Sequence, residues 1–136
     1  MTHPRFDRVP SWFVVLPDCS AAEPIALALR GEATCVAQHP SGRAWLLGRW
    51  AEEDAAIVQC GDTAIAVLGE HLLSAAFLSQ IAARVHTLAD LDEPSRSWAG
   101  NFHLIASVAG QVRIQSPISG FRRVFHATTG GLTVAA

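Results

Sequence analysis

Few side chains in this chain are suited to covalent chemistry, and they are scattered. The three cysteines, Cys19, Cys35 and Cys60, are odd in number and widely spaced, which excludes a disulfide framework and a Cys-x-x-Cys metal site. Cys60 lies beside Asp62 in an expected turn and is interpreted as an ordinary turn cysteine. Thr2 is the other candidate nucleophile. Removal of the initiator methionine would give it the free α-amine of an N-terminal nucleophile.

The histidines and carboxylates do not form a metal or acid–base motif. None of the histidines has a partner at i, i+2 or i, i+4, the spacings typical of metal ligands; they are His3, His39, His71, His86, His103 and His126. We expect His103 and His126 to meet across neighbouring strands as a structural pair. Glu52-Glu53-Asp54 is predicted to be a solvated loop. We therefore expect no metal or cofactor in this chain.

The composition describes one ordinary globular domain with a weakly charged surface. The 136 residues are 50% hydrophobic and 16% charged, with a net charge of −2. This excludes a disordered chain and suggests that another domain or a partner covers part of the surface. The basic residues are all arginines, and scattered arginines are not typical of nucleic-acid binding. No apolar run is long enough for a signal peptide or a membrane span, so we expect a cytoplasmic, bacterial protein.

The first half of the chain alternates strand and helix patterns. Residues 1–10 are expected to be an irregular lead-in, and Trp12 to Leu16 a buried strand. The spacing of Ser20 and Glu23 predicts a capping box for a helix that ends at about Arg30. Two strands follow, at 34–38 and 44–50, with a turn at 39–42 between them. Residues 55–59 and 63–68 are predicted to form a hairpin.

The second half is predicted to contain one helix and two hairpins. Ser74 can cap a helix whose Phe77, Leu78, Ile81 and Val85 share one face. Residues 87–97 are expected to be a loop. Hairpins are expected at 102–108 with 112–115, and at 123–127 with 131–135. Two helices and about eight short strands, mostly linked by hairpins, indicate a layered α+β domain with antiparallel sheets. The four tryptophans are assigned to core or interdomain packing.

The last 40 residues carry a pattern that resembles a known family. Residues 98–104, Trp-Ala-Gly-Asn-Phe-His-Leu, resemble the Leu-x-Gly-x-Phe-Ala-Phe strand of class II glutamine amidotransferases. Residues 115–126 are similar to the Arg-Asp-x-x-Gly segment of that family, and residues 131–136 to the next strand. Leu68-Gly69-Glu70-His71 stands where the family has Asn-Gly-Glu-Ile. The resemblance covers residues 11–136 and implies an N-terminal-nucleophile (Ntn) hydrolase-like fold, with helix–sheet–sheet–helix layers.

Within this family, residues 39–48 are most similar to the asparagine synthetase-like cyclases that close the lactam ring of lasso peptides. The resemblance also identifies the positions of the glutaminase site. The nucleophilic cysteine corresponds to about Ser11, which lies inside the chain and so lacks the free α-amine that serves as base. The oxyanion-hole asparagine corresponds to Leu68, followed by Gly69 and Glu70, and the Arg-Asp pair to Gln115 and Ser116. These substitutions predict a domain without glutaminase activity.

The expected function follows from these substitutions. The resemblance implies a non-catalytic scaffold that packs on an ATP-dependent ligase domain or on a separate ligase subunit. ATP and Mg²⁺ would bind to that ligase. The scaffold would help to present a precursor peptide. Two alternatives remain. One is an active amidohydrolase that uses Thr2, Ser11 or an internal cysteine, and the other is a free-standing module that forms a homodimer.

Overall fold

A computed structural model describes residues 12–115, 126–129 and 132–135. All strand pairs in these ranges are antiparallel, and they form two separate sheets. Sheet A has the order β2-β3-β1-β9-β8, from β1 (Trp12–Val15), β2 (Cys35–Gln38), β3 (Ala44–Arg49), β8 (His126–Thr129) and β9 (Leu132–Ala135). Sheet B has the order β4-β5-β6-β7, from β4 (Ala55–Cys60), β5 (Thr63–His71), β6 (Gly100–Val108) and β7 (Gln111–Gln115).

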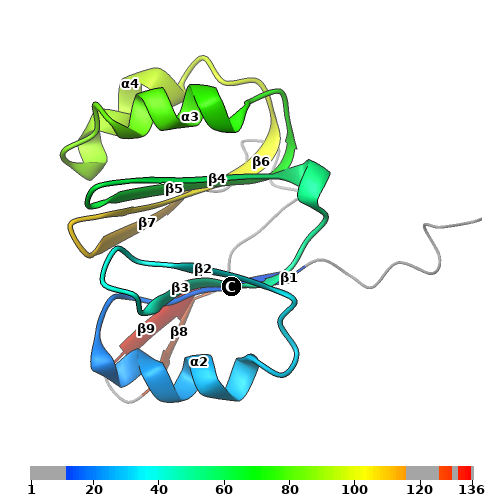
Figure 1. Cartoon of the computed structure of the whole chain (residues 1–136), viewed down its shortest axis with the longest axis vertical. Coiled ribbons are helices and arrows are strands. Elements are labelled where there is room, and N and C mark those ends of the chain that lie inside the picture. Colours follow the sequence, from blue (N-terminus) through cyan, green and yellow to red (C-terminus); the bar gives the residue numbers. More distant parts are fainter. Residues whose placement is uncertain (1–11, 116–125, 130–131, 136) are drawn as a thin grey trace, which may run out of the picture.

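The two sheets lie face to face and helices cover their outer surfaces, so the molecule has four layers (Figure 1). Helix α2 (Glu23–Leu29) lies against sheet A, whereas α3 (Ala75–Ala82) and α4 (Asp92–Ser95) lie against sheet B. Short 3₁₀ helices precede α2 (η1, Ser20–Ala22), β4 (η2, Glu52–Asp54) and α4 (η3, Leu88–Leu91). The prediction of a layered α+β domain with antiparallel sheets is confirmed.

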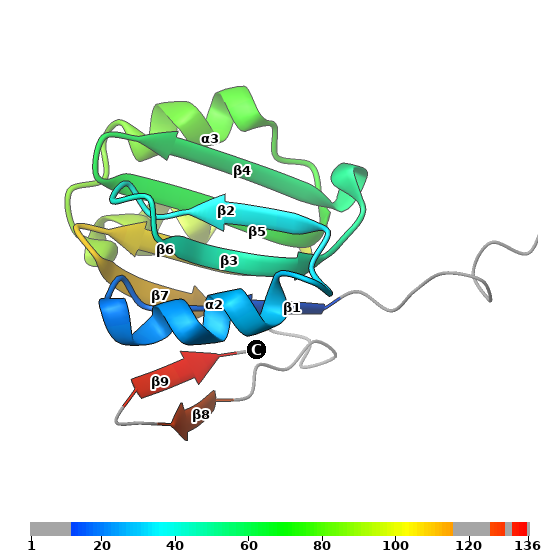
Figure 2. The same cartoon turned by 60° about the horizontal axis from the view of Figure 1, so that its bottom comes forward.

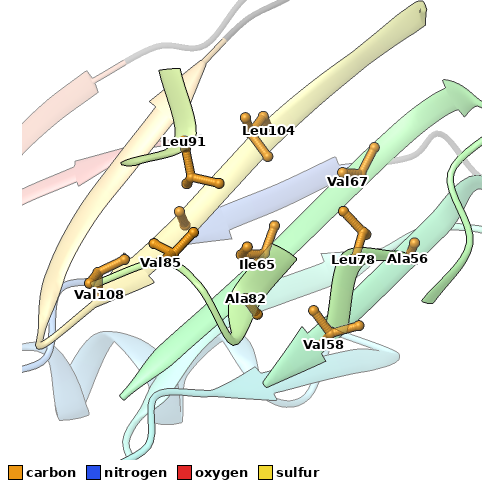
Figure 3. Packing of buried hydrophobic residues seen from close by; sticks show 11 residues of the cluster. Ala56, Val58, Ile65, Val67, Leu78, Ala82, Val85, Leu91, Leu104 and Val108 are labelled. Atoms are coloured by element: carbon orange, nitrogen blue, oxygen red, sulfur yellow. The ribbon is translucent and has the colours of Figure 1, made fainter. Parts of the chain in front are cut away.

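Alternation along each strand distributes the apolar side chains among three interfaces. In β5, Ile65 and Val67 face the helices of sheet B, whereas Ala64, Ala66 and Leu68 face sheet A. Figure 3 shows the outer cluster, in which Leu78 and Ala82 of α3 pack on Ile65, Val58 and Val67. A third cluster joins Leu16 and Leu47 to α2. Each interface uses one face of a strand, as expected for residues of period two.

Several expected elements agree with the structure in type and approximate position. Ser74 caps α3 by accepting a hydrogen bond from the amide of Phe77 at 3.1 Å. The hairpins β4–β5 and β6–β7 close over two-residue loops, Gly61-Asp62 and Ala109-Gly110. Of the last expected hairpin, the structure describes β8 (His126–Thr129) and β9 (Leu132–Ala135), and residues 123–125 lie outside the described ranges.

Two expectations about the helical segments were wrong. Ser20 does not cap a helix through its side chain, because the chain first forms η1 and the Glu23 carboxylate instead accepts a hydrogen bond from Arg43. Residues 87–97 are not a loop throughout. Thr87 and Asp90 form a capping box that starts η3, and α4 follows directly. Residues 87–97 are mostly polar, which favoured the prediction of a loop. The Thr87–Asp90 capping box nevertheless starts a short helix there.

Candidate functional site

Three of the residues that the resemblance assigns to a glutaminase site, Leu68, Gly69 and Glu70, lie where β5 ends and β6 begins. There Leu68 pairs with His103, Gly69 with Phe102, Glu70 with Asn101 and His71 with Gly100. The backbones approach closely at this point. Gly69 and Gly100 have φ of 131° and 137°, and a Cβ on Gly69 would lie 2.6 Å from the carbonyl oxygen of Asn101. Only glycine fits this strand end, because it alone adopts such dihedrals and leaves room for the neighbouring chain.

Leu68 is part of the apolar interior between the sheets. Its side chain is only 5% exposed and belongs to the cluster that includes Val15, Trp45 and Ile105. Close by, the ring of Phe13 in β1 meets the His103 ring edge-on, with centroids 5.1 Å apart. Apolar and aromatic side chains therefore fill this part of the space between the sheets. A leucine side chain has no donor for an oxyanion.

The residues after Leu68 turn outward or bond locally. Glu70 is exposed to solvent. His71 Nδ1 accepts a hydrogen bond from the amide of Leu73 at 3.0 Å, and the His71 ring meets Phe102 edge-on. Because Nδ1 accepts, the ring hydrogen of neutral His71 resides on Nε2, which is buried and has no partner among the described residues. His71 was expected only as part of the motif Leu68 to His71.

Gln115 lies on the other face of sheet B from Leu68. It pairs with Leu104, which packs toward the helices, and residues directly opposite each other share a face. Its Oε1 accepts a hydrogen bond from Arg113 at 3.1 Å, and Arg113 also forms an ion pair with Asp92 of α4. The structure therefore does not bring Gln115 and Leu68 into one cavity. Thr2, Ser11 and Ser116 lie outside the described residues.

A buried histidine–serine pair joins the two sheets, and sequence analysis missed it. His39, in the turn after β2, is 1% exposed, and Ser107 of β6 is fully buried. The ring Nδ1 lies 2.7 Å from Ser107 Oγ, and Nε2 donates to the carbonyl oxygen of Leu16 at 2.8 Å. Because a carbonyl oxygen can only accept, Nε2 carries a hydrogen and Nδ1 can accept from the serine hydroxyl. A hydroxyl without solvent access cannot meet a substrate, so we interpret the pair as structural.

A charged cluster lies beside this turn on the outer side of sheet A. Asp18 Oδ1 accepts hydrogen bonds from Ser41 Oγ at 2.7 Å and from Arg43 Nη1 at 3.4 Å, and Arg43 Nε donates to Glu23 of α2 at 3.2 Å. The bond from Ser41, followed by that from Arg43, holds the pKa of the Asp18 carboxyl below 3.8 against the opposing effect of burial. The cluster borders an open hollow of about 570 Å³ along α2. It fixes the β2–β3 turn to the helix.

The other candidate residues remain dispersed. The cysteines do not form disulfides, and no three His, Cys, Asp or Glu residues are grouped for a metal within the described ranges. His103 belongs to β6 and His126 to β8, which are strands of different sheets, so the two residues do not lie on neighbouring strands of one sheet as expected. Glu52-Glu53-Asp54 forms the short 3₁₀ helix η2, in which Glu52 and Glu53 are exposed to solvent as expected. Trp45 is fully buried, and Trp98 contacts the ring of Phe77.

The described residues form a two-sheet α+β protein in which apolar side chains fill the space between the sheets. Comparison of the chain with protein-family models, curated proteins and solved structures finds no match. Among the residues that the structure describes, no helix has both the length and the apolar character needed to cross a membrane.

Proposed function

We propose that this chain is a non-catalytic, glutaminase-like domain of an asparagine synthetase-like enzyme that forms amide or lactam bonds with ATP. In this proposal it has an Ntn-hydrolase-like fold and packs on a ligase domain or subunit of the lasso-peptide cyclase type. Its role is to support that domain and to help present the peptide substrate. The amine that forms the lactam belongs to the peptide itself, so no ammonia from glutamine is required.

The layered architecture supports this proposal. Two antiparallel sheets that face each other, with helices outside both, are the arrangement that the resemblance implies (Figure 1). The strand order also places Leu68 and β1 near each other, since Leu68 pairs with His103 and His103 contacts Phe13. In this proposal, the residue at the position of the oxyanion donor and the strand that would carry the nucleophile therefore lie close together between the sheets.

The observation that carries the proposal is the environment of Leu68. A glutaminase needs a polar donor and open space at this position, because one such donor accounts for about 10²–10³ in rate. Here the side chain is apolar, 5% exposed and packed into the core cluster between the sheets. A substrate amide would have to displace this packing to reach the site.

A glutaminase assay tests the absence of this chemistry. We expect no release of ammonia from glutamine by the wild-type chain, or by its Thr2→Ala and Ser11→Ala variants. Turnover that either substitution abolishes would overturn the proposal in favour of an active amidohydrolase. Self-association without a ligase, detected by light scattering, would favour the free-standing module.

A second experiment tests the scaffold role. The gene downstream of the codon for Ala136 is sequenced, and any ligase found there is expressed with and without residues 1–136. We expect an ATP-binding domain with a Ser-Gly-Gly-x-Asp loop, whose ligation of a peptide amine falls when this domain is removed. Equal ligation by both forms would contradict a scaffold role.

A further inference from the structure

The edge of β4 is a long and unprotected strand edge. β4 is a terminal strand of sheet B, and all six of its residues, Ala55 to Cys60, are uncharged and none is proline. Proteins usually protect such edges with charged side chains, prolines or bulges, because the unpaired amide and carbonyl groups of an edge strand can bond to a strand of another chain. The β4 edge has none of these features along its length.

The hairpin geometry determines which main-chain groups of β4 are available. Cys60 and Thr63 flank a two-residue loop, and such flanking residues exchange their hydrogen bonds with each other. Since the pattern alternates, Val58 and Ala56 also bond to β5. The amide and carbonyl groups of Ile57 and Gln59 and the carbonyl group of Ala55 therefore point away from the sheet, whereas the amide of Ala55 donates to the carbonyl oxygen of Glu52 at the end of η2. An added strand can bond to these three residues.

A groove continues from this edge into the space between the sheets. It has a volume of about 480 Å³ and is bordered by β2 and β4, which lie on the same side of the molecule (Figure 2). Val36, Ala37, Trp45 and Ile57 provide its apolar lining, and Arg30, Gln38 and Gln59 are polar residues around it. In an added strand, the residue opposite Ile57 points to the same side as Ile57. Its side chain would therefore enter this groove.

Acidic residues flank the edge at both ends and define the charge of the occupant. Glu52, Glu53 and Asp54 precede β4, and Asp62 follows it in the loop. None of the four forms an ion pair with a described residue. An antiparallel second copy centred on Ile57 would place Glu52 opposite Asp62 of that copy, at both ends. This repulsion disfavours a second copy, whereas basic residues at the ends of a peptide are attracted.

We propose that the β4 edge binds an extended peptide segment whose apolar residues alternate and whose ends are basic. The peptide adds a fifth strand to sheet B through Ala55, Ile57 and Gln59, as in other cases of β-strand addition. Its central apolar side chain occupies the groove beside Trp45 and Val36. This proposal does not rest on the proposed ligase association, because the strand edge, the groove and the acidic residues that carry it all belong to this chain.

Fluorescence anisotropy with labelled nonapeptides tests this site on the full chain. The probe is Arg-Arg-Val-Thr-Val-Thr-Val-Arg-Arg, which places valine opposite Ile57 and arginines beside both acidic ends. A matched peptide carries glutamate in place of every arginine. We expect the arginine peptide to bind at least about tenfold more tightly at low salt, and this preference to shrink in about 0.5 M salt. Equal binding of both peptides would overturn the proposal.

Ile57→Pro blocks the edge without removing a hydrogen bond between β4 and β5, although it also shortens a side chain that packs on the cluster between the sheets. The amide of Ile57 points outward, so proline removes a donor for the peptide and no hydrogen bond to β5. Ile57→Val, which keeps the amide, is the matched control. We expect at least about tenfold weaker binding for the proline variant and nearly unchanged binding for the valine variant. Circular dichroism establishes that both remain folded.

Two results would contradict the assignment. Unchanged peptide binding by a folded Ile57→Pro variant would place the peptide elsewhere. A wild-type dimer in light scattering that becomes monomeric in Ile57→Pro would make a second copy the occupant of the edge. If the proline variant unfolds, Gln59→Pro, which also replaces an outward amide, is used in its place, with the same expected loss.

Discussion

The bond between His39 and Ser107 gives a quantitative prediction about what holds the two sheets together. Ser107→Ala removes one hydroxyl from a fully buried position, and the side chain that remains fits without steric conflict. The substitution leaves Nδ1 of His39, which is 1% exposed, without its 2.7 Å partner. Leaving a buried polar atom unsatisfied costs about 1–3 kcal/mol, more than the net value of an ordinary hydrogen bond. We expect the free energy of unfolding to fall by this amount.

Urea denaturation followed by tryptophan fluorescence measures this effect. With a denaturant slope of about 1–3 kcal/mol per molar, the midpoint should fall by on the order of 1 M without a change in slope. Ser79→Ala is the matched control, because Ser79 is an exposed residue of α3. This substitution should change stability by less than about 0.5 kcal/mol.

A double-mutant cycle separates the pair from its surroundings. His39→Phe keeps an aromatic ring but leaves both Ser107 Oγ and the Leu16 carbonyl without their bonds, so it should cost more than Ser107→Ala. The double variant should cost less than the sum of the single variants, because the two residues share one bond. Additive effects, or a Ser107→Ala variant as stable as the wild type, would refute the assignment of a buried bond between the sheets.

Two further predictions concern the charged cluster and the end of β5. Because the folded pKa of Asp18 is held below 3.8, the stabilisation that Asp18 provides should be present above about pH 4 and be lost as the pH falls through that lower folded value. Urea titrations at about pH 7 and pH 3 should therefore differ less for Asp18→Asn than for the wild type, and an equal difference would contradict the folded pKa. Gly69→Ala should cost more than about 2 kcal/mol, because of its φ of 131° and the 2.6 Å approach of its Cβ to Asn101. Gly31→Ala is the control in the same thermal melt, because a Cβ on Gly31 meets no atom within 4 Å. Equal melting temperatures of the Gly69→Ala and Gly31→Ala variants would contradict the prediction, since the end of β5 would then accommodate the added methyl group.

The short-range features of the fold could be predicted from the sequence, because neighbouring residues determine them. The two-residue hairpin at Gly61-Asp62 and the Ser74 cap depend on side chains and dihedrals within a few residues. The continuous apolar run from Ala64 to Leu68 in β5 likewise indicates a strand buried on both faces. The capping-box spacing alone did not suffice to predict a cap. Ser20 and Glu23 have the correct spacing, but the Glu23 carboxylate accepts a hydrogen bond from Arg43, which is distant in the sequence.

The candidate site could be located in part. Leu68, Gly69 and Glu70 are adjacent in the sequence, so their common position in β5 follows directly, and the resemblance indicated that the donor was missing. The face that each residue presents did not follow. Gln115 was grouped with Leu68, but the register of β6 and β7 places it on the side of the helices, where Arg113 binds it. A shift of one residue in register would have reversed this result.

The sequence by itself determined the class of the domain, its two-residue turns, the Ser74 cap and the absence of a polar donor at Leu68, since composition, spacing and residue type suffice for these. Tertiary structure alone decided which distant residues meet. It brought His39 to Ser107, separated by 68 positions in the chain, and placed His103 and His126 in different sheets. It also left β4 at an edge beside β2, so the peptide site proposed here exists only after the sheets have packed. The physical reason is that these contacts depend on strand order and register, which are set by how two whole sheets bury their faces.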